Sequence, residues 1–268
     1  MSDILGGSPV RKMNHVPGDP LAPGQVLPDC DLLTWARAQK ELLDRAHIAH
    51  PDQPYGYVFE TPLGTTPLLT NCSSFLARVL AGWLGTVEDA MVPAGPGVRP
   101  MRLDDRVNIR NEGHEPERNV WGPRRDVAAL GSLLRANDRG MRGAPTALVD
   151  LGRGIEIAAA DDIRANTVLQ AWRFRVNGGT TSVHAGHAVI ATRGVLPGGH
   201  IETFGAHEPH VAEEALITPN GTLTLLRGES VGVRTLDHYT QVDRVFFGSV
   251  PAALQNGTYG VIFGANPT

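Results

Sequence analysis

Lysine is scarce in this sequence of 268 residues, and neither sign of charge is in large excess. Lys12 and Lys40 are the only lysines, so arginine supplies nearly all of the 24 basic side chains. These face 28 acidic side chains, which leaves a net charge of −4. Proteins that bind nucleic acid or an anionic surface through charge carry a basic excess. We therefore expect no nucleic-acid partner.

Long apolar runs are also missing. The longest stretches, such as residues 185–191, fall far short of the ~20 apolar residues that a membrane-spanning helix needs. The first twenty residues lack the basic start and apolar core of a secretory signal. We expect no membrane span and, by default, a cytoplasmic protein. A substrate outside the cell would then require a non-classical export route or release by a phage.

Cysteine is nearly absent as well, since Cys30 and Cys72 are the only two. A disulfide framework needs more than one pair, so this class of small, cross-linked protein is excluded. In a large chain without a secretory signal, a lone thiol is structural or catalytic. With 41% hydrophobic residues, the chain is able to form a hydrophobic core.

The first 28 residues are rich in glycine and proline and have no apolar periodicity, which predicts an extended or disordered lead-in. Apolar residues then recur at helical spacing over residues 31–49 and again over residues 71–85. Asn71 stands where a helix N-cap belongs, and Gly85 stands where a helix ends. Cys72 is therefore expected in the first turn of a buried helix.

The rest of the chain favours β-structure. Apolar runs bounded by turn residues predict strands, and Asn-Gly pairs at 220–221 and 256–257 are typical of hairpins. A helix is expected only at residues 126–137. The predicted strands cover residues 149–160, 168–176, 187–192 and 200–204, with a turn at 177–179. The expected fold class is α+β.

Cys72 has a physical reason to be reactive. The N-terminus of a helix carries partial positive charge and free N–H groups, which stabilise a thiolate and the oxyanion of an acyl-transfer intermediate. His187 is expected to open an apolar strand, where it could serve as the base of a Cys–His pair. Glu202 or His200, on the next strand, could hold the far side of the His187 ring. A buried core cysteine and a surface histidine are the structural alternatives.

Four segments in this order resemble the NlpC/P60 cysteine peptidases, a branch of the papain-like fold. They are PYGY at 54–57, NCSSFLARVL at 71–80, GHAVIA at 186–191 and HIET at 200–203. The resemblance implies Cys72 as nucleophile and His187 as base. It also implies Tyr55 at the oxyanion site, with Tyr57 as second choice. The family's variable third polar residue matches Glu202 best, with His200 as the alternative.

The sequence departs from the family pattern twice. Ser74 stands where the family usually has glycine, and His187 follows Cys72 by 115 residues, which is much longer than in compact members. We therefore expect a single catalytic domain over residues 29–268 with an insertion at about 86–160. Its core would be papain-like, with the Cys72 helix packed on an antiparallel sheet.

The resemblance implies a bacterial hydrolase, a thiol protease or amidase that cleaves amide bonds in peptidoglycan stem peptides of the cell wall. It implies no cofactor and no metal, and a peptide or peptidoglycan substrate as the partner. Two alternatives stay open. The chain could be a papain-like enzyme acting on a protein or acyl substrate, or a non-catalytic interaction module. The sequence gives no indication of the oligomeric state.

A metal site is the rival chemistry. Five histidines fall within 27 residues, and zinc accepts three or four nitrogen, oxygen or sulfur ligands. The histidine pairs have no helical i, i+4 spacing, and no acidic or cysteine partner is placed as it is in known zinc motifs. The five are His184, His187, His200, His207 and His210.

Overall fold

The fold is taken from a computed structural model that describes twelve stretches of the chain. These are residues 30–58, 68–85, 91–92, 101–102, 125–126, 144–177, 180–209, 213–218, 221–227, 230–236, 244–247 and 257–268. The chain divides into two compact units. The first unit is Met1–Ala90 with Phe204–Val233, and the second is Met91–Thr203 with Arg234–Thr268. The expected lead-in and most of the expected insertion lie outside the described residues.

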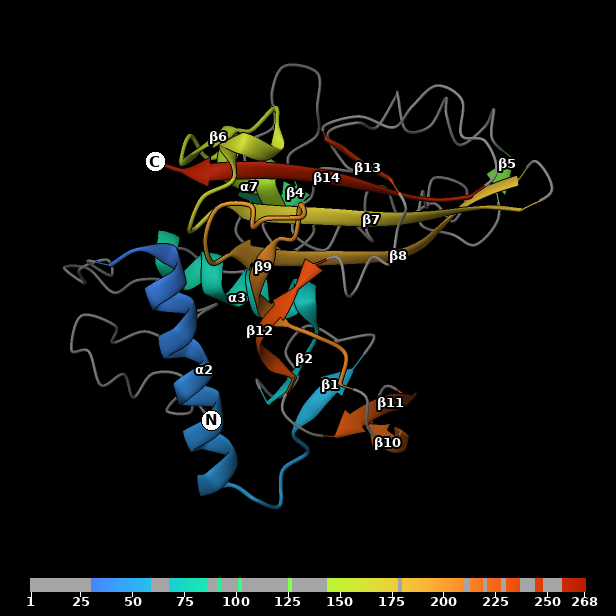
Figure 1. Cartoon of the computed structure of the whole chain (residues 1–268). Coiled ribbons are helices and arrows are strands. Elements are labelled where there is room, and N and C mark those ends of the chain that lie inside the picture. Colours follow the sequence, from blue (N-terminus) through green and yellow to red (C-terminus); the bar gives the residue numbers. More distant parts are fainter. Residues whose placement is uncertain are drawn as a thin grey trace. The chain divides into compact units, whose positions relative to one another are not determined.

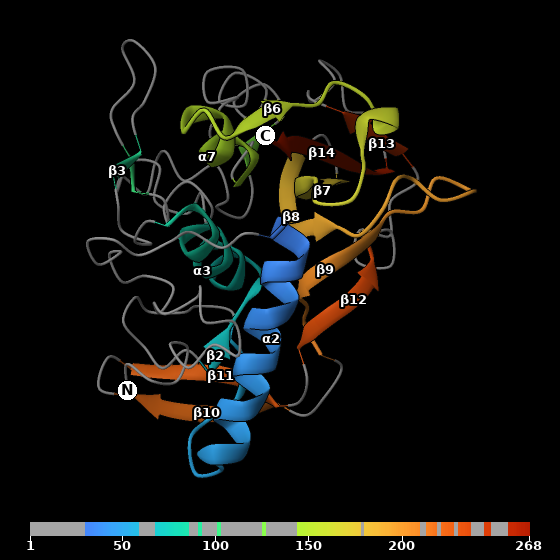
Figure 2. The ribbon, with the colours of Figure 1, turned by 90° about the vertical axis from the view of Figure 1, so that its left-hand side faces the viewer.

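The two helices described in the first unit agree with the sequence prediction. Helix α2 (Leu32–Ala49) is capped by Asp31, whose carboxylate accepts the N–H of Thr34 at 2.8 Å. Helix α3 (Cys72–Leu84) packs against it (Figure 2). The Trp35 indole donates to the Val79 carbonyl at 2.9 Å and occupies the space that a side chain at Gly82 would need. The apolar stripe of each helix therefore packs against the other helix.

A small sheet of the first unit leads directly into α3. Its strand order is β10-β11-β1-β2, with β1 and β2 parallel and the other neighbours antiparallel. The sequence predicted a loop between the two helices, because runs this short give no periodic signal. The bounds are β1 (Gly56–Val58), β2 (Leu69–Thr70), β10 (Glu213–Thr218) and β11 (Gly221–Arg227). Since β2 ends one residue before the cap of α3, the sheet fixes where that helix begins.

The large sheet of the structure has the order β12-β9-β8-β7-β14-β13, with β6 beside β14 and β5 beside β8. Figure 1 shows the long strands β7, β8 and β14 running side by side. The bounds are β5 (Arg125–Asp126), β6 (Gly154–Glu156), β7 (Val168–Asn177), β8 (Thr180–Ala191), β9 (Glu202–Ala206), β12 (Val231–Thr235), β13 (Arg244–Phe247) and β14 (Gly257–Pro267). Strands β3 (Met91–Val92) and β4 (Met101–Arg102) form a separate pair. The division between the two units falls within β9 and β12.

The core of the second unit lies on one face of β7 and β8. Leu169 and Ala171 of β7 and Val189 and Ala191 of β8 belong to it. These positions share a face because cross-strand partners point the same way and side chains alternate along each strand. The other buried members are Ile157, Ile163, Ile201, Leu236 and Ile262. The α+β class predicted from the sequence is therefore confirmed, with mainly antiparallel pairing.

Some predicted elements were wrong. The strand expected at residues 149–160 is replaced by helix α7 (Ala144–Asp150), the short strand β6 and the 3₁₀ turn η2 (Ala160–Asp162). Gly152, with φ of +67°, forces a turn after the helix, and the Asp162 carboxylate accepts the Ala158 and Ala159 N–H groups. Of the helix expected at 126–137, Asp126 lies in β5 and the rest lies outside the described residues. In the part of the chain that is described, no helix is both long and apolar enough to cross a membrane.

Candidate active site

Cys72 is the first residue of α3, as the sequence predicts. Asn71 caps the helix, and Gly85 ends it in the left-handed conformation with φ of +69°. The Cys72 side chain lies 3.8 Å, sulfur to oxygen, from the hydroxyl of Ser73. The residue is 8% exposed, so the thiol is almost covered but is not sealed into the core.

Hydrogen bonds at the start of α3 leave two N–H groups for a ligand. The Asn71 side chain accepts the Ser74 N–H at 2.8 Å, and the Ser74 hydroxyl accepts the Asn71 N–H at 2.9 Å. This reciprocal capping box uses two of the four donors that a helix leaves unpaired at its start. Within the described residues, the N–H groups of Cys72 and Ser73 have no acceptor. They are the donors nearest the sulfur.

The Thr70 hydroxyl connects β2 to the first turn of α3 through hydrogen bonds. Its oxygen lies 3.2 Å from the Ser74 hydroxyl oxygen, and it donates to the Asn71 carbonyl at 3.2 Å. In the sequence, Ser74 stands out only as a departure from the glycine that is usual in the family. The signal that could have identified its role is the spacing Asn71-x-x-Ser74, a capping box with serine in place of the usual glutamate or glutamine.

The two candidate tyrosines have different surroundings in the first unit. The Tyr55 ring stacks on His47 of α2, with centroids 4.2 Å apart, and its hydroxyl donates to Asp44 at 3.3 Å. Tyr57 is buried in β1 opposite Thr70 of β2. The structure thus holds Tyr55 against α2, and it brings the strand of Tyr57 beside the segment that leads into Cys72.

Cys30 lies at the other end of α3. Its carbonyl accepts a hydrogen bond from the Trp83 indole at 3.0 Å, and neither cysteine forms a disulfide. Trp83 follows Cys72 by about three helical turns, or roughly 16 Å along the axis. The Cα atoms of a disulfide lie within about 7 Å of each other, so Cys30 and Cys72 are not a disulfide pair in this fold.

His187 lies inside β8 of the second unit, which corrects the prediction that it opens a strand. Strand β8 begins at Thr180, and His187 stands opposite Ala171 of β7 with 1% of its surface exposed. Gly186 does not break the strand. The Trp172 ring covers it so closely that a Cβ there would come within 2.3 Å of a ring carbon. The close packing of the Trp172 ring therefore requires a residue without a side chain at position 186.

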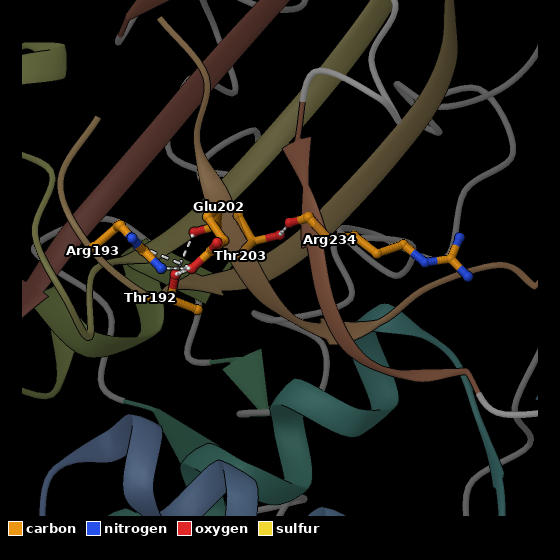
Figure 3. Close-up of polar contacts among 5 residues, drawn as sticks. All are labelled: Thr192, Arg193, Glu202, Thr203 and Arg234. Carbon is orange, nitrogen blue, oxygen red and sulfur yellow. Dashed lines mark hydrogen bonds and ion pairs between the residues drawn. The ribbon is translucent and has the colours of Figure 1, made fainter. Parts of the chain in front are cut away.

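Glu202 lies at the start of β9 and is engaged by two neighbours from the end of β8 (Figure 3). Its carboxylate accepts the Thr192 hydroxyl at 2.5 Å and forms an ion pair with the Arg193 guanidinium at 2.8 Å. The backbone N–H of Thr192 also donates to the Glu202 carbonyl at 3.0 Å. On the other side of β9, the Thr203 hydroxyl donates to the Arg234 carbonyl at 2.9 Å. Glu202 therefore stands opposite Thr192, five residues beyond His187 along β8.

The remaining histidines have separate settings. His200 is exposed in the turn before β9, where its carbonyl accepts the Leu196 N–H at 2.8 Å. His207, in the first unit, is buried, and its Nε2 lies 3.2 Å from the Gly232 carbonyl. His210 and the side chain of His184 lie outside the described part of the structure. Among the residues that are described, no three histidine, cysteine, aspartate or glutamate side chains gather as metal ligands would.

Comparison with known proteins finds no family model, no curated protein and no solved structure that matches the chain.

Proposed function

We propose that the chain is a cysteine hydrolase of amide bonds, with Cys72 as nucleophile and His187 as its base. The observation that carries the proposal is the start of α3, where a thiol and two N–H donors without an acceptor in the described residues stand together. A helix N-terminus stabilises a thiolate and can hold a developing oxyanion.

The burial of His187 suits a base that works in a closed site. It is 1% exposed and sits in the middle of a long strand, so its ring has little freedom to move. Within the first unit, Phe204 of β9 packs against Phe75 of α3 with ring centroids 6.2 Å apart. The pairing of Cys72 in the first unit with His187 in the second is itself the proposal.

The reaction proposed is acyl transfer through a thioester. The Cys72 thiolate attacks the carbonyl carbon, and the N–H groups of Cys72 and Ser73 donate to the oxyanion that forms. The C–N bond then breaks as His187 gives its proton to the leaving amine. Water, losing a proton to His187, hydrolyses the thioester and frees the thiol. Glu202 is proposed to orient His187, as the resemblance implies, although in the structure its carboxylate binds Thr192 and Arg193.

The substrate proposed is the peptide stem of peptidoglycan. This rests on the resemblance of the motifs around Cys72 and His187 to the NlpC/P60 peptidases, within a papain-like core. The test is to incubate the purified chain with bacterial sacculi and to identify the released fragments by mass spectrometry. We expect peptide fragments with a new amino terminus from the wild type and none from Cys72→Ala. Release by both proteins, or by neither, would contradict this substrate and mechanism.

A further inference from the structure

Thr70, the last residue of β2, is held in a fixed place beside the first turn of α3. It is 3% exposed, and Tyr57 of the parallel strand β1 stands opposite it. The Gly56 N–H of β1 also donates to the Leu68 carbonyl, just before β2, at 3.2 Å. Threonine is branched at Cβ, so its χ1 angle has few options. The small sheet therefore determines where the Thr70 hydroxyl lies.

The acceptor of the Thr70 hydroxyl is the carbonyl of Asn71. This carbonyl accepts the Thr70 O–H at 3.2 Å and the Phe75 N–H, a backbone bond of the first turn of α3, at 3.0 Å. A hydroxyl has one proton and two lone pairs, so Thr70 can donate to Asn71 and still accept from the Ser74 hydroxyl, 3.2 Å away. The carbonyl is thus held from the strand side and from the helix side.

The Asn71 carbonyl belongs to the same peptide group as the Cys72 N–H. A peptide group is planar and trans, so its N–H points opposite to its C=O, and fixing one fixes the other. Hydrogen bonds in a chain also polarise one another, so a C=O that accepts bonds makes the N–H of its own peptide group a stronger donor. Within the described residues, the Cys72 N–H has no acceptor. Thr70 thus orients and strengthens a donor that it does not touch.

We propose that Thr70 is a positioning residue for acyl transfer at Cys72. Its hydroxyl sets the Asn71–Cys72 peptide group so that the Cys72 N–H donates to the oxyanion of the reaction. This inference rests on the proposed function, because it takes Cys72 as the nucleophile. It involves residues of the first unit alone, and the identity of the base does not enter it. The role is confined to reactions of the Cys72 sulfur that pass through an oxyanion.

The experiment compares two reactions of the same sulfur, of which only one forms an oxyanion. The thiolate attacks the carbonyl carbon of p-nitrophenyl acetate, and the oxyanion collapses as the C–O bond breaks, which leaves an acetyl thioester and p-nitrophenolate. With iodoacetamide an S–C bond forms as iodide leaves, and no oxyanion arises. Both rates are measured on the full-length chain with Cys30→Ser, in which Cys72 is the single thiol. Cys72→Ala in the same background gives the rate to be subtracted.

Four variants are compared with this parent protein. Thr70→Val removes the hydroxyl and nearly keeps the shape of the side chain, Thr70→Ala removes it without adding a methyl group, and Thr70→Ser restores it. Thr167→Val is the matched control, because Thr167 carries a buried hydroxyl of the second unit that donates to the Asn266 side chain. Thermal unfolding of each variant is recorded beside the two rates.

We expect Thr70→Val and Thr70→Ala to slow acylation about tenfold, since removing an oxyanion donor outright costs on the order of a hundredfold or more. Their iodoacetamide rates should stay within about twofold of the parent rate, because displacement of iodide forms no oxyanion. Thr70→Ser should recover most of the acylation rate, and Thr167→Val should match the parent protein in both reactions.

Two kinds of failure are distinguishable in this experiment. Equal slowing of both reactions in the Thr70 variants, or slowing of neither, would overturn the positioning role of Thr70 and leave Cys72 as the nucleophile. Slow reaction of the parent protein with both reagents would contradict the proposed nucleophile instead.

Discussion

Glu202 is the residue whose predicted role and observed contacts differ most. We expect Glu202→Ala to lower activity about tenfold if the carboxylate orients His187, because an orienting group matters less than the base itself. Its bonds to Thr192 and Arg193 would be lost as well, at a cost near 1 kcal/mol for partly exposed groups. Activity and thermal unfolding are measured together.

Arg193→Ala is the matched control for Glu202, because it removes the ion pair and leaves the Thr192 hydrogen bond in place. The orienting role predicts a loss of activity in Glu202→Ala that Arg193→Ala does not share. Equal losses in both variants would show that Glu202 acts only by joining β8 to β9. A larger loss in His200→Ala would move the third role to His200.

Single residues also show what a sequence can and cannot reveal. The position of Cys72 at a helix start followed from Asn71 and Gly85, because caps are read locally. The settings of Tyr55 and Tyr57 did not follow. Which of them lies beside the segment before Cys72 depends on the pairing of β1 with β2, and that pairing joins strands too short to leave a periodic pattern.

The capped start of α3 gives a prediction at the scale of the element. Ser74→Ala should cost about 1 kcal/mol of stability by opening the capping box. It should also slow acylation of Cys72 by p-nitrophenyl acetate about tenfold, since the N–H groups that receive the oxyanion lose their fixed orientation. Released p-nitrophenolate reports the acylation rate.

Asp31→Ala provides the comparison for that loss, because it removes the cap of α2 at a similar cost and does not touch the first turn of α3. We expect its acylation rate to stay near the parent value. If Asp31→Ala slowed acylation as much as Ser74→Ala, the effect would be one of stability, and the orienting role of the capping box would be wrong.

Strand β8 gives a second prediction of this kind. Gly186→Ala should destabilise the fold by about 1–3 kcal/mol, because its Cβ would overlap the Trp172 ring. Gly232→Ala of β12 is the control, since a Cβ there meets nothing within 4 Å. Urea denaturation measures both. Equal stability of the two variants would contradict the close packing of Trp172 over β8.

Elements with strong local signals were predicted well, and those fixed by distant partners were not. The stripes of α2 and α3 and the apolar run of β7 are local features, whereas β8 begins at Thr180 and not at His187 as predicted. Strand β13, by contrast, pairs with β14 in parallel, so the Asn-Gly pair at 256–257 does not join them as a tight hairpin. Parallel pairing needs a crossover connection, which turn residues alone do not indicate.

At the scale of the whole molecule, the order of the motifs is the basis of the proposed chemistry, but it does not indicate how the chain divides into two units. The first unit includes Phe204–Val233, which lies far along the chain from α3. Phe204 of this segment packs against Phe75 of α3. Whether such a remote segment joins the unit depends on the burial of apolar faces between segments far apart in the sequence. No local sequence pattern indicates it. The roles of Cys72, His187, Glu202 and Tyr55 stay predictions.

The cysteine mechanism predicts how the whole protein responds to a chelator. Release of fragments from sacculi should be unchanged by EDTA and abolished by iodoacetamide, because the nucleophile is a thiol. The two treatments are compared on the same preparation. Activity that survives iodoacetamide and is lost with EDTA would favour a metal site in the histidine cluster over Cys72.

The most direct test of the central claim is the alkylation rate of Cys72 at neutral pH, with and without His187. The protein carries Cys30→Ser, which we expect to be nearly silent because Cys30 lies at the far end of α3. We predict that iodoacetamide modifies Cys72 faster than it modifies glutathione, since a His187 partner maintains the thiolate. We also predict that His187→Ala slows the reaction at least about tenfold while the circular dichroism spectrum is kept. Slow modification that His187→Ala leaves unchanged would contradict the Cys72–His187 pair.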